Sequence, residues 1–277
     1  MRVSIEGPTI RSRGTRQKAA VPLSFRVSNN MKRISGVDGC KGGWIAFHFD
    51  GSLWSGKLFK NISELYAEAD SELILIDIPI GLRENEASER LCDLQARAVL
   101  DKRKSSVFPS PSRVALFCKD YSQASRKNRE SSGRGLSKQS FSIIPKIREV
   151  DVFVQSADYF PKKKIIREVH PEICFWGLNR RSEMNYYKND TLGKCERLEV
   201  LNQYIKDAKK IFDAVRIRYR KQYVADSDII DAMGCAVTAI FNDSLSTFPP
   251  KPEKDSKGLS MEIVYYSSNQ RLERGVR

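Results

Sequence analysis

The chain has 277 residues, 40% of them hydrophobic and 30% charged, which is typical of a globular protein with a sizeable core. No run of 18 apolar residues occurs, which excludes a transmembrane helix. The 48 Lys and Arg residues outnumber the 34 Asp and Glu residues, and the formal charge of +14 indicates a polyanionic partner, nucleic acid before an anionic membrane.

The N-terminal segment is a basic leader, residues 1–30, without the apolar core of a secretory signal. Its composition fits an organelle transit peptide or a disordered arm that binds nucleic acid. It also fits an over-extended gene start, because Met31 opens a good first strand. Residues 1–33, which include Lys32 and Arg33, carry a net charge of +7, which is half of the total.

The next segments predict the beginning of a β-sheet. Residues 34–38 and 44–49 are apolar runs around a glycine-rich turn, which indicates a hairpin, and residues 51–57 extend it as a meander. A short helix capped by Asn61 or Ser63 follows. Residues 73–80 then form a continuous apolar run of the kind found in strands buried on both faces.

The rest of the chain alternates helical and strand patterns with loops. Prolines 109 and 111 bound a loop, residues 122–140 read as a mobile basic loop, and residues 247–257 read as a proline-rich linker. Helices are predicted over residues 84–104, 141–157, 193–215 and 227–242, and strands over residues 164–170 and 261–266. We therefore predict one α/β domain over residues 31–267, followed by a tail, 268–277. Its mixed sheet is antiparallel first, parallel later, and flanked by helices.

Cysteine and histidine usage restricts the chemistry. The six cysteines are scattered without a CxxC pair, which predicts reduced thiols in a cytoplasmic protein. Only two histidines, His48 and His170, are present, so a multi-histidine metal centre is excluded. Any metal must therefore have oxygen ligands, which favours Mg²⁺ or Mn²⁺.

Acidic residues interrupt the apolar strands. Asp38, Asp77 and Glu168 each lie in a predicted strand, and Asp228 and Asp231 share one face of a late apolar helix. Buried carboxylates that converge repel each other unless cations lie between them, and two divalent ions can clamp a phosphoryl displacement. Each acid also has a plainer reading: a turn residue for Asp38 and Asp77, a helix cap for Asp228, and an ion pair with Arg for Glu168.

These motifs resemble the domain-of-unknown-function family 429, which is predicted to contain ribonuclease-H-like nucleases. The resembling segments are residues 36–44, 76–81, 90–97, 106–108, 135–139, 145–147, 168–172, 193–197, 228–232 and 258–265. The resemblance implies a ribonuclease-H-like fold in which Asp38, Asp77 and Asp231 hold metal ions. Asp231 and the alanine after it also resemble the last-helix motif of Holliday-junction resolvases. Glu168 or Glu172 is a further candidate ligand.

Several other residues are candidates for the chemistry. His170 fits a general base, a substrate contact or a satisfied core histidine. Lys41, Arg97, Lys138 and Lys146 are candidate phosphate contacts, and Arg97 alternatively pairs with Asp93.

The leading hypothesis is a metal-dependent nuclease acting on DNA or RNA, with catalytic roles for Asp38, Asp77, Glu168, His170 and Asp231. Metal-ligand roles fall on Asp38, Asp77, Glu172, Asp228 and Asp231. The alternatives are a nucleotide-phosphate hydrolase or phosphotransferase on the same core, and a non-catalytic protein that binds nucleic acid.

Overall fold

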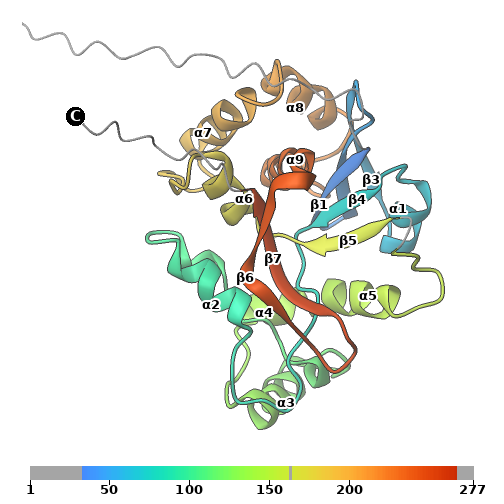
Figure 1. Cartoon of the computed structure of the whole chain (residues 1–277), viewed down its shortest axis with the longest axis vertical. Coiled ribbons are helices and arrows are strands. Elements are labelled where there is room, and N and C mark those ends of the chain that lie inside the picture. Colours follow the sequence, from blue (N-terminus) through green and yellow to red (C-terminus); the bar gives the residue numbers. More distant parts are fainter. Residues whose placement is uncertain (1–32, 162–163, 267–277) are drawn as a thin grey trace, which may run out of the picture.

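A five-stranded mixed sheet lies at the centre of the fold in this computed structural model, which describes residues 33–161 and 164–266 (Figure 1). Its strands are β1 (Ile34–Cys40), β2 (Gly43–Phe49), β3 (Trp54–Phe59), β4 (Leu73–Ile76) and β5 (Ile165–Glu168). In the order β3-β2-β1-β4-β5, the first three strands are antiparallel, and β4 and β5 run parallel to β1. The predicted mixed α/β sheet is thus confirmed. The leader (1–30) and the tail (268–277) lie outside the described residues.

Both faces of this sheet are covered by helices. Leu73 and Leu75 of β4 belong to one hydrophobic cluster, whereas Ile74 and Ile76 belong to another on the opposite face. Successive side chains of a strand point to opposite faces, so a strand between two helical layers must be apolar throughout. This explains the continuous apolar run in the sequence.

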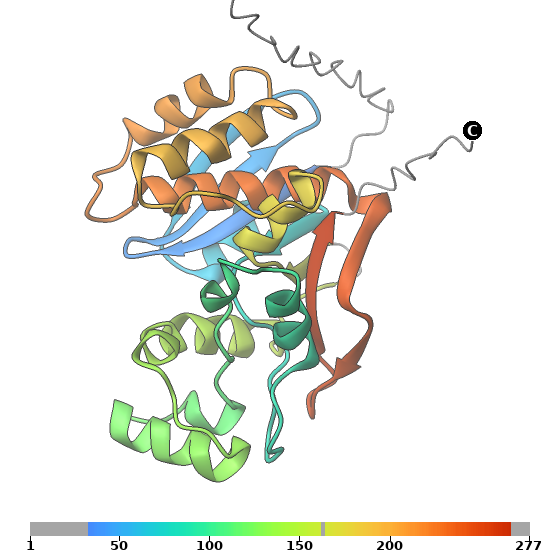
Figure 2. The same ribbon diagram turned by 90° about the vertical axis from the view of Figure 1, so that its left-hand side faces the viewer.

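Four helices cover the first face, and the figures show them stacked on one side of the sheet (Figure 2). They are α6 (Pro171–Leu178), α7 (Thr191–Asn202), α8 (Ala208–Arg216) and α9 (Asp226–Ile240). Helix α9 lies directly on β1, at a point where Gly36 leaves no room for a side chain. A Cβ at Gly36 would lie 2.0 Å from the Ala236 backbone nitrogen. This close approach brings the first turns of α9 towards the carboxyl end of β1.

The opposite face is covered by α1 (Ile62–Glu68) and α5 (Ile144–Val154). Asn61 caps α1 by accepting a hydrogen bond from the Glu64 backbone, as predicted. Pro145 lies in the first turn of α5, where a missing backbone donor costs little.

The predicted basic loop over residues 122–140 is wrong. Two helices occupy it, α3 (Tyr121–Ser132) and α4 (Lys138–Ser142). Asp120 caps α3 by accepting from the Gln123 backbone, and Gly133, with φ of +73°, ends it. A well-capped helix of good helix formers therefore forms despite its small apolar face.

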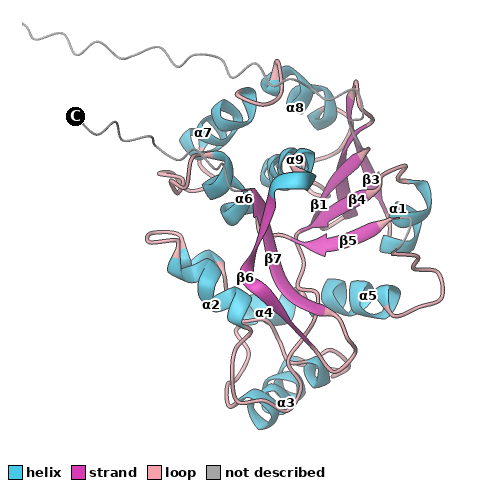
Figure 3. Ribbon diagram, in the orientation of Figure 1, coloured by secondary structure: helices cyan, strands magenta, loops and turns pink. Residues whose placement is uncertain are grey.

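The predicted linker over residues 247–257 is also wrong. The segment forms β6 (Leu245–Lys254), which pairs antiparallel with β7 (Ser260–Tyr266) (Figure 3). The three prolines of β6 lie in the irregular stretch between Phe248 and Glu253, where the pairing register shifts, and proline is tolerated at such bulges. A bridge between Val169 and Val264 places β7 beside the end of β5.

Two predicted helices are shorter in the structure. The helix expected over residues 84–104 is only α2 (Leu91–Ala98), because Asn85 has φ of +56° and the Glu183 carboxylate accepts from the backbone at 101–103. The helix expected over residues 193–215 is split into α7 and α8, with Asp207 at φ of +59° between them. Helix α6 has no counterpart among the predicted elements. Within the described ranges, no helix has the length and apolarity needed to cross a bilayer.

Candidate functional site

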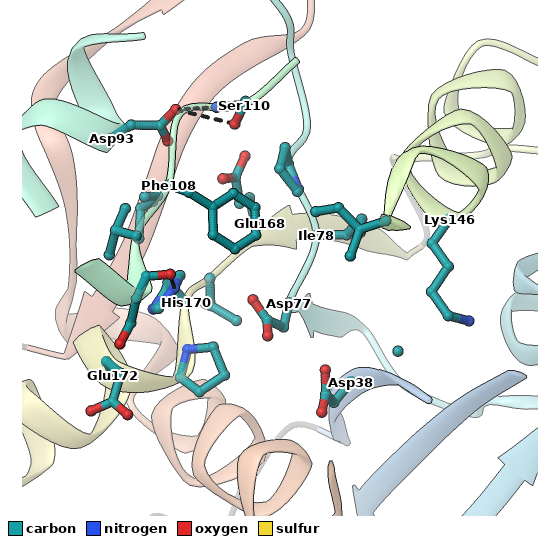
Figure 4. A pocket seen from close by; sticks show the side chains of 18 of the residues that line it. Asp38, Asp77, Ile78, Asp93, Phe108, Ser110, Lys146, Glu168, His170 and Glu172 are labelled. Atoms are coloured by element: carbon teal, nitrogen blue, oxygen red, sulfur yellow. Dashed lines mark hydrogen bonds between the residues drawn. The ribbon is translucent and has the colours of Figure 1, made fainter. Parts of the chain in front are cut away.

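A pocket of about 400 Å³ opens where the carboxyl ends of β1, β4 and β5 meet (Figure 4). Asp38 lies near the end of β1, Asp77 follows β4, and Glu168 ends β5. Parallel strands present their carboxyl ends at one edge of a sheet, which is where open α/β sheets bind ligands. The strand acids predicted from the sequence therefore lie at one pocket.

The carboxyls of Asp38 and Asp77 are neighbours in this pocket. Asp38 is only 7% exposed, Asp77 is half-buried, and each carboxyl affects the pKa of the other. Burial, and then the neighbouring charges of Asp77 and Asp231, raises the pKa of Asp38 well above its ordinary value. Burial likewise raises the pKa of Asp77 to about 7. One of these carboxyls readily holds a proton near neutral pH, unless a cation replaces it.

Helix α9 contributes two further acids. Asp231 is 1% exposed, and its charge raises the pKa values of both Asp38 and Asp77, so it lies behind that pair. Asp228 lines the pocket, but one of its oxygens accepts a 2.7 Å hydrogen bond from the Ala225 backbone. Asp228 therefore caps α9, as the plainer reading predicted, and its other oxygen lies 3.5 Å from the Ser227 hydroxyl.

Lys188 is a site residue that the sequence analysis missed. Its Nζ lies 2.6 Å from Asp231 Oδ2, and its side chain lines the pocket from the loop before α7. The negative charge of Asp231, followed by those of Asp38 and Asp77, raises the pKa of Lys188. One ammonium thus balances part of the charge of three carboxylates. A lysine in a polar loop carries no sequence signal of this role.

Glu168 lies in a buried ion-pair network. Arg90 donates to both of its oxygens, at 2.8 and 2.7 Å, and the Ile80 backbone donates at 2.6 Å. Arg90 also contacts Asp93, 2.6 Å away. Burial raises the pKa of Glu168 to about 7. The alternative interpretation of Glu168, an ion pair with an arginine, matches these contacts. The ion pair holds Glu168 and Arg90 together in the lining of the pocket.

A family model described as "Protein of unknown function (DUF429)" matches residues 36–254, which contain every site residue described above. The chain belongs to this family. No curated protein matches the chain, and no solved structure matches it. The site of this DUF429 protein therefore has to be interpreted from its own geometry.

His170 and Glu172 flank the first turn of α6 and line the same pocket. His170 Nε2 lies 3.3 Å from the Ser106 carbonyl, which can only accept, so Nε2 carries the proton and Nδ1 is an acceptor. Burial lowers the pKa of His170, which keeps the ring neutral. Arg197 donates to Glu172 Oε1 at 2.6 Å. Among the described residues, neither His170 Nδ1 nor Glu172 Oε2 has a hydrogen-bond partner.

Of the four predicted phosphate contacts, only Lys146 lines the pocket. Its Nζ lies 2.6 Å from the Gly43 carbonyl and 4.3 Å from the centre of the Trp44 ring. Arg97 instead donates a hydrogen bond to the carbonyl of Val107, a residue of the pocket lining. It forms an ion pair with Glu89 rather than with Asp93. Lys41 and Lys138 are exposed and lie outside the pocket.

The donor set of the site fits a hard divalent cation in its chemistry, because the acids that line it offer only oxygen ligands. No three His, Cys, Asp or Glu side chains of the described residues form a ready-made metal site. The pair formed by Asp38 and Asp77 supplies two ligands. Mg²⁺ commonly binds to one or two carboxylates and takes its other ligands from water and substrate phosphates.

Proposed function

We propose that this DUF429 protein is a metal-dependent nuclease that hydrolyses phosphodiester bonds of nucleic acid. The proposal depends on one observation: Asp38 from β1 and Asp77 from the end of β4 line one pocket, and Asp231 of α9 is close enough for its charge to raise the pKa values of both. The resemblance to ribonuclease-H-like nucleases implies the same distribution of acids. The mixed sheet, antiparallel first and parallel later, is consistent with that fold.

In this proposal Asp38 and Asp77 hold Mg²⁺ or Mn²⁺, with Asp231 as the third ligand. Asp228 and Glu172 line the same pocket, and Glu172 Oε2 has no hydrogen-bond partner among the described residues. A divalent ion at this position would activate water and neutralise charge on the phosphoryl group. The bound ion would also replace the proton that the Asp38–Asp77 pair otherwise holds.

The cationic and neutral side chains have separate roles. Lys188 can release Asp231 and turn to the substrate phosphate, because its side chain reaches the pocket from a loop and is 43% exposed. Lys146 is a second positive charge on the pocket wall. His170, neutral and with Nδ1 free, can accept a proton from the attacking water. Glu168, held by Arg90, supports the wall rather than the reacting atoms.

The test is cleavage of labelled single-stranded, duplex, hybrid and branched DNA and RNA by the full chain with Mg²⁺ or Mn²⁺. We expect metal-dependent cleavage that falls at least about 100-fold in Asp38→Asn and in Asp231→Asn, more than the loss of an outer partner typically costs. Asp158→Asn, an equivalent change at an exposed position, is the matched control. Cleavage that persists in both site variants contradicts the proposal.

A nucleotide-phosphate hydrolase is the second candidate, because the enclosed pocket is the size of a small-molecule site. Nucleoside triphosphates in the same assay distinguish it from a nuclease. If no substrate is cut and Asp38→Asn leaves nucleic-acid affinity unchanged, the protein is a non-catalytic binder.

A further inference from the structure

We infer that the pocket receives one unpaired nucleotide unit at a time, either the end of a single strand or a free nucleoside phosphate. This inference rests on the proposed phosphodiester chemistry and specifies its substrate. The interior of a duplex is excluded. The depth of the acids, the character of the pocket lining and an exposed aromatic residue next to Lys188 support it.

The carboxylates lie too deep for an intact duplex. Asp38, which lines a pocket of about 400 Å³, is 7% exposed, and its neighbour Asp231 is 1% exposed. That volume is within the range of sites that enclose a small molecule, about 300–1,000 Å³. Enzymes that act inside such pockets take the nucleotide out of the duplex or bind a single strand. The phosphate of a single unpaired unit can reach the acids.

Apolar side chains contribute to the pocket lining. Phe108 and Ile78 lie above Asp77 in the view of Figure 4, on either side of Glu168, and Pro79 and Val107 also line the pocket. Phe108 is only partly buried, so its ring is available for contact. An aromatic ring beside a phosphate-binding site provides a stacking surface for a nucleobase, and such stacking tolerates any base.

A second end of the pocket offers hydrogen-bond acceptors. His170 Nδ1 and Glu172 Oε2 lack partners among the described residues, and both residues line the pocket. A buried acceptor without a donor costs about 1–3 kcal/mol. Sugar hydroxyls and base amino groups are donors, so a nucleoside entering the pocket supplies the donor that Glu172 Oε2 lacks, whereas His170 Nδ1 faces the attacking water of the proposed function. Lys146 lies on the opposite side of Asp77 from His170 (Figure 4), so a positive charge is present at the other end of the pocket.

An exposed aromatic residue lies next to a pocket residue in the chain. Tyr187 is 70% exposed and immediately precedes Lys188, which lines the pocket. The Arg103 guanidinium lies 4.1 Å from the centre of the Tyr187 ring, and Arg103 is itself fixed by a 2.9 Å hydrogen bond to the Asn185 carbonyl. Tyr187 is therefore held in place before any ligand binds. A single strand leaving the pocket can stack its next base on this ring.

Three substrates with Mn²⁺ test the inference: a linear single strand, a covalently closed circle of the same sequence, and thymidine 5′-p-nitrophenyl phosphate. We expect mononucleotides from the linear strand, hydrolysis of the ester, and an intact circle. Hydrolysis of the ester without cleavage of the strand also supports the inference and identifies free nucleoside phosphates as the substrate. If the circle is cut as fast as the linear strand, the inference is wrong and the proposed nuclease remains.

Two aromatic substitutions test the roles of Phe108 and Tyr187. Phe108→Ala should raise KM for the ester about tenfold, since stacking is worth about 1–3 kcal/mol per base. Phe117→Ala, which removes a ring that is 61% exposed outside the pocket, is the matched control. Tyr187→Ala should raise KM for the linear strand more than for the ester. Equal effects of Phe108→Ala and Phe117→Ala contradict the inference.

If no substrate is cut, the proposed nuclease fails, and binding of thymidine monophosphate decides the inference separately. Calorimetry that detects binding, weakened about tenfold by Phe108→Ala and unchanged by Phe117→Ala, supports a nucleotide pocket without hydrolysis. No detectable binding overturns the inference.

Discussion

Replacing Gly36 by Ala tests how the site is assembled, because this residue lets α9 approach β1. The added Cβ would lie 2.0 Å from the Ala236 nitrogen and 2.4 Å from the Ala232 oxygen. Ordinary contact requires about 3.5 Å, so the helix must retreat by roughly 1–1.5 Å. Both clashing atoms belong to the backbone and cannot rotate away. We therefore expect a loss at the upper end of the overpacking range, about 3 kcal/mol in the free energy of unfolding.

Urea denaturation followed by circular dichroism measures this loss. The control is Gly135→Ala, whose Cβ would lie 3.0 Å from the ends of two flexible side chains. Where Gly36→Ala remains folded, the displacement of α9 separates Asp231 from Asp38. A misplacement of about 1 Å can cost about 100-fold in rate, so cleavage should fall by that order.

Two outcomes would refute this reasoning. One is a change in unfolding free energy below about 0.5 kcal/mol, the range of ordinary surface substitutions. The other is rescue by Ala236→Gly, which removes only a side chain and leaves the clashing backbone atoms in place.

Three further predictions concern the charges of the site. Lys188→Met should raise Mn²⁺ affinity several-fold in calorimetry, because Asp231 loses the cation that neutralises it, and a fall in affinity would contradict that role. Mn²⁺ affinity should fall as the pH drops through about 7, where the Asp77 carboxyl takes up a proton. The free energy of unfolding of the metal-free protein should instead rise as the pH falls from 7 towards 4. In that range the folded state binds a proton at Asp77, whereas the unfolded state, with an Asp pKa near 3.8, does not. Asp77→Asn should flatten both profiles, and unchanged profiles in this variant would assign the titration to another group. Arg90→Met should lower the free energy of unfolding by about 3–5 kcal/mol, since it leaves Glu168 buried without its partner, and a near-neutral result in urea denaturation would count against the network.

The sequence predicts the acids of the site better than their partners. Asp38, Asp77 and Asp231 stand out because each interrupts an apolar segment, and a buried carboxylate needs compensation. Their neighbours carry no such signal. Lys188 lies in a polar loop, and Arg90 is 78 positions away from Glu168 along the chain. Partners at such separations depend on tertiary packing.

The errors in the fold have physical causes of the same kind. Residues 247–257 contain three prolines and read as a linker, yet β6 forms because β7 pairs with residues on both sides of the irregular stretch that holds the prolines. The segment around α3 is polar and glycine-bounded, yet the cap at Asp120 and good helix formers suffice. In both places a local contact that composition does not reveal outweighs the average character of the segment.

The pocket lining is drawn from segments that span most of the chain, from Asp38 to Ile263. During synthesis, β1 leaves the ribosome long before α9 and β7 exist. Nearly two hundred residues must be synthesised after Asp38 before Asp231 is present and the acidic residues can come together. Contacts this distant form late in folding. A nascent or truncated chain therefore lacks the assembled site, and any activity begins only when the whole domain has closed around it.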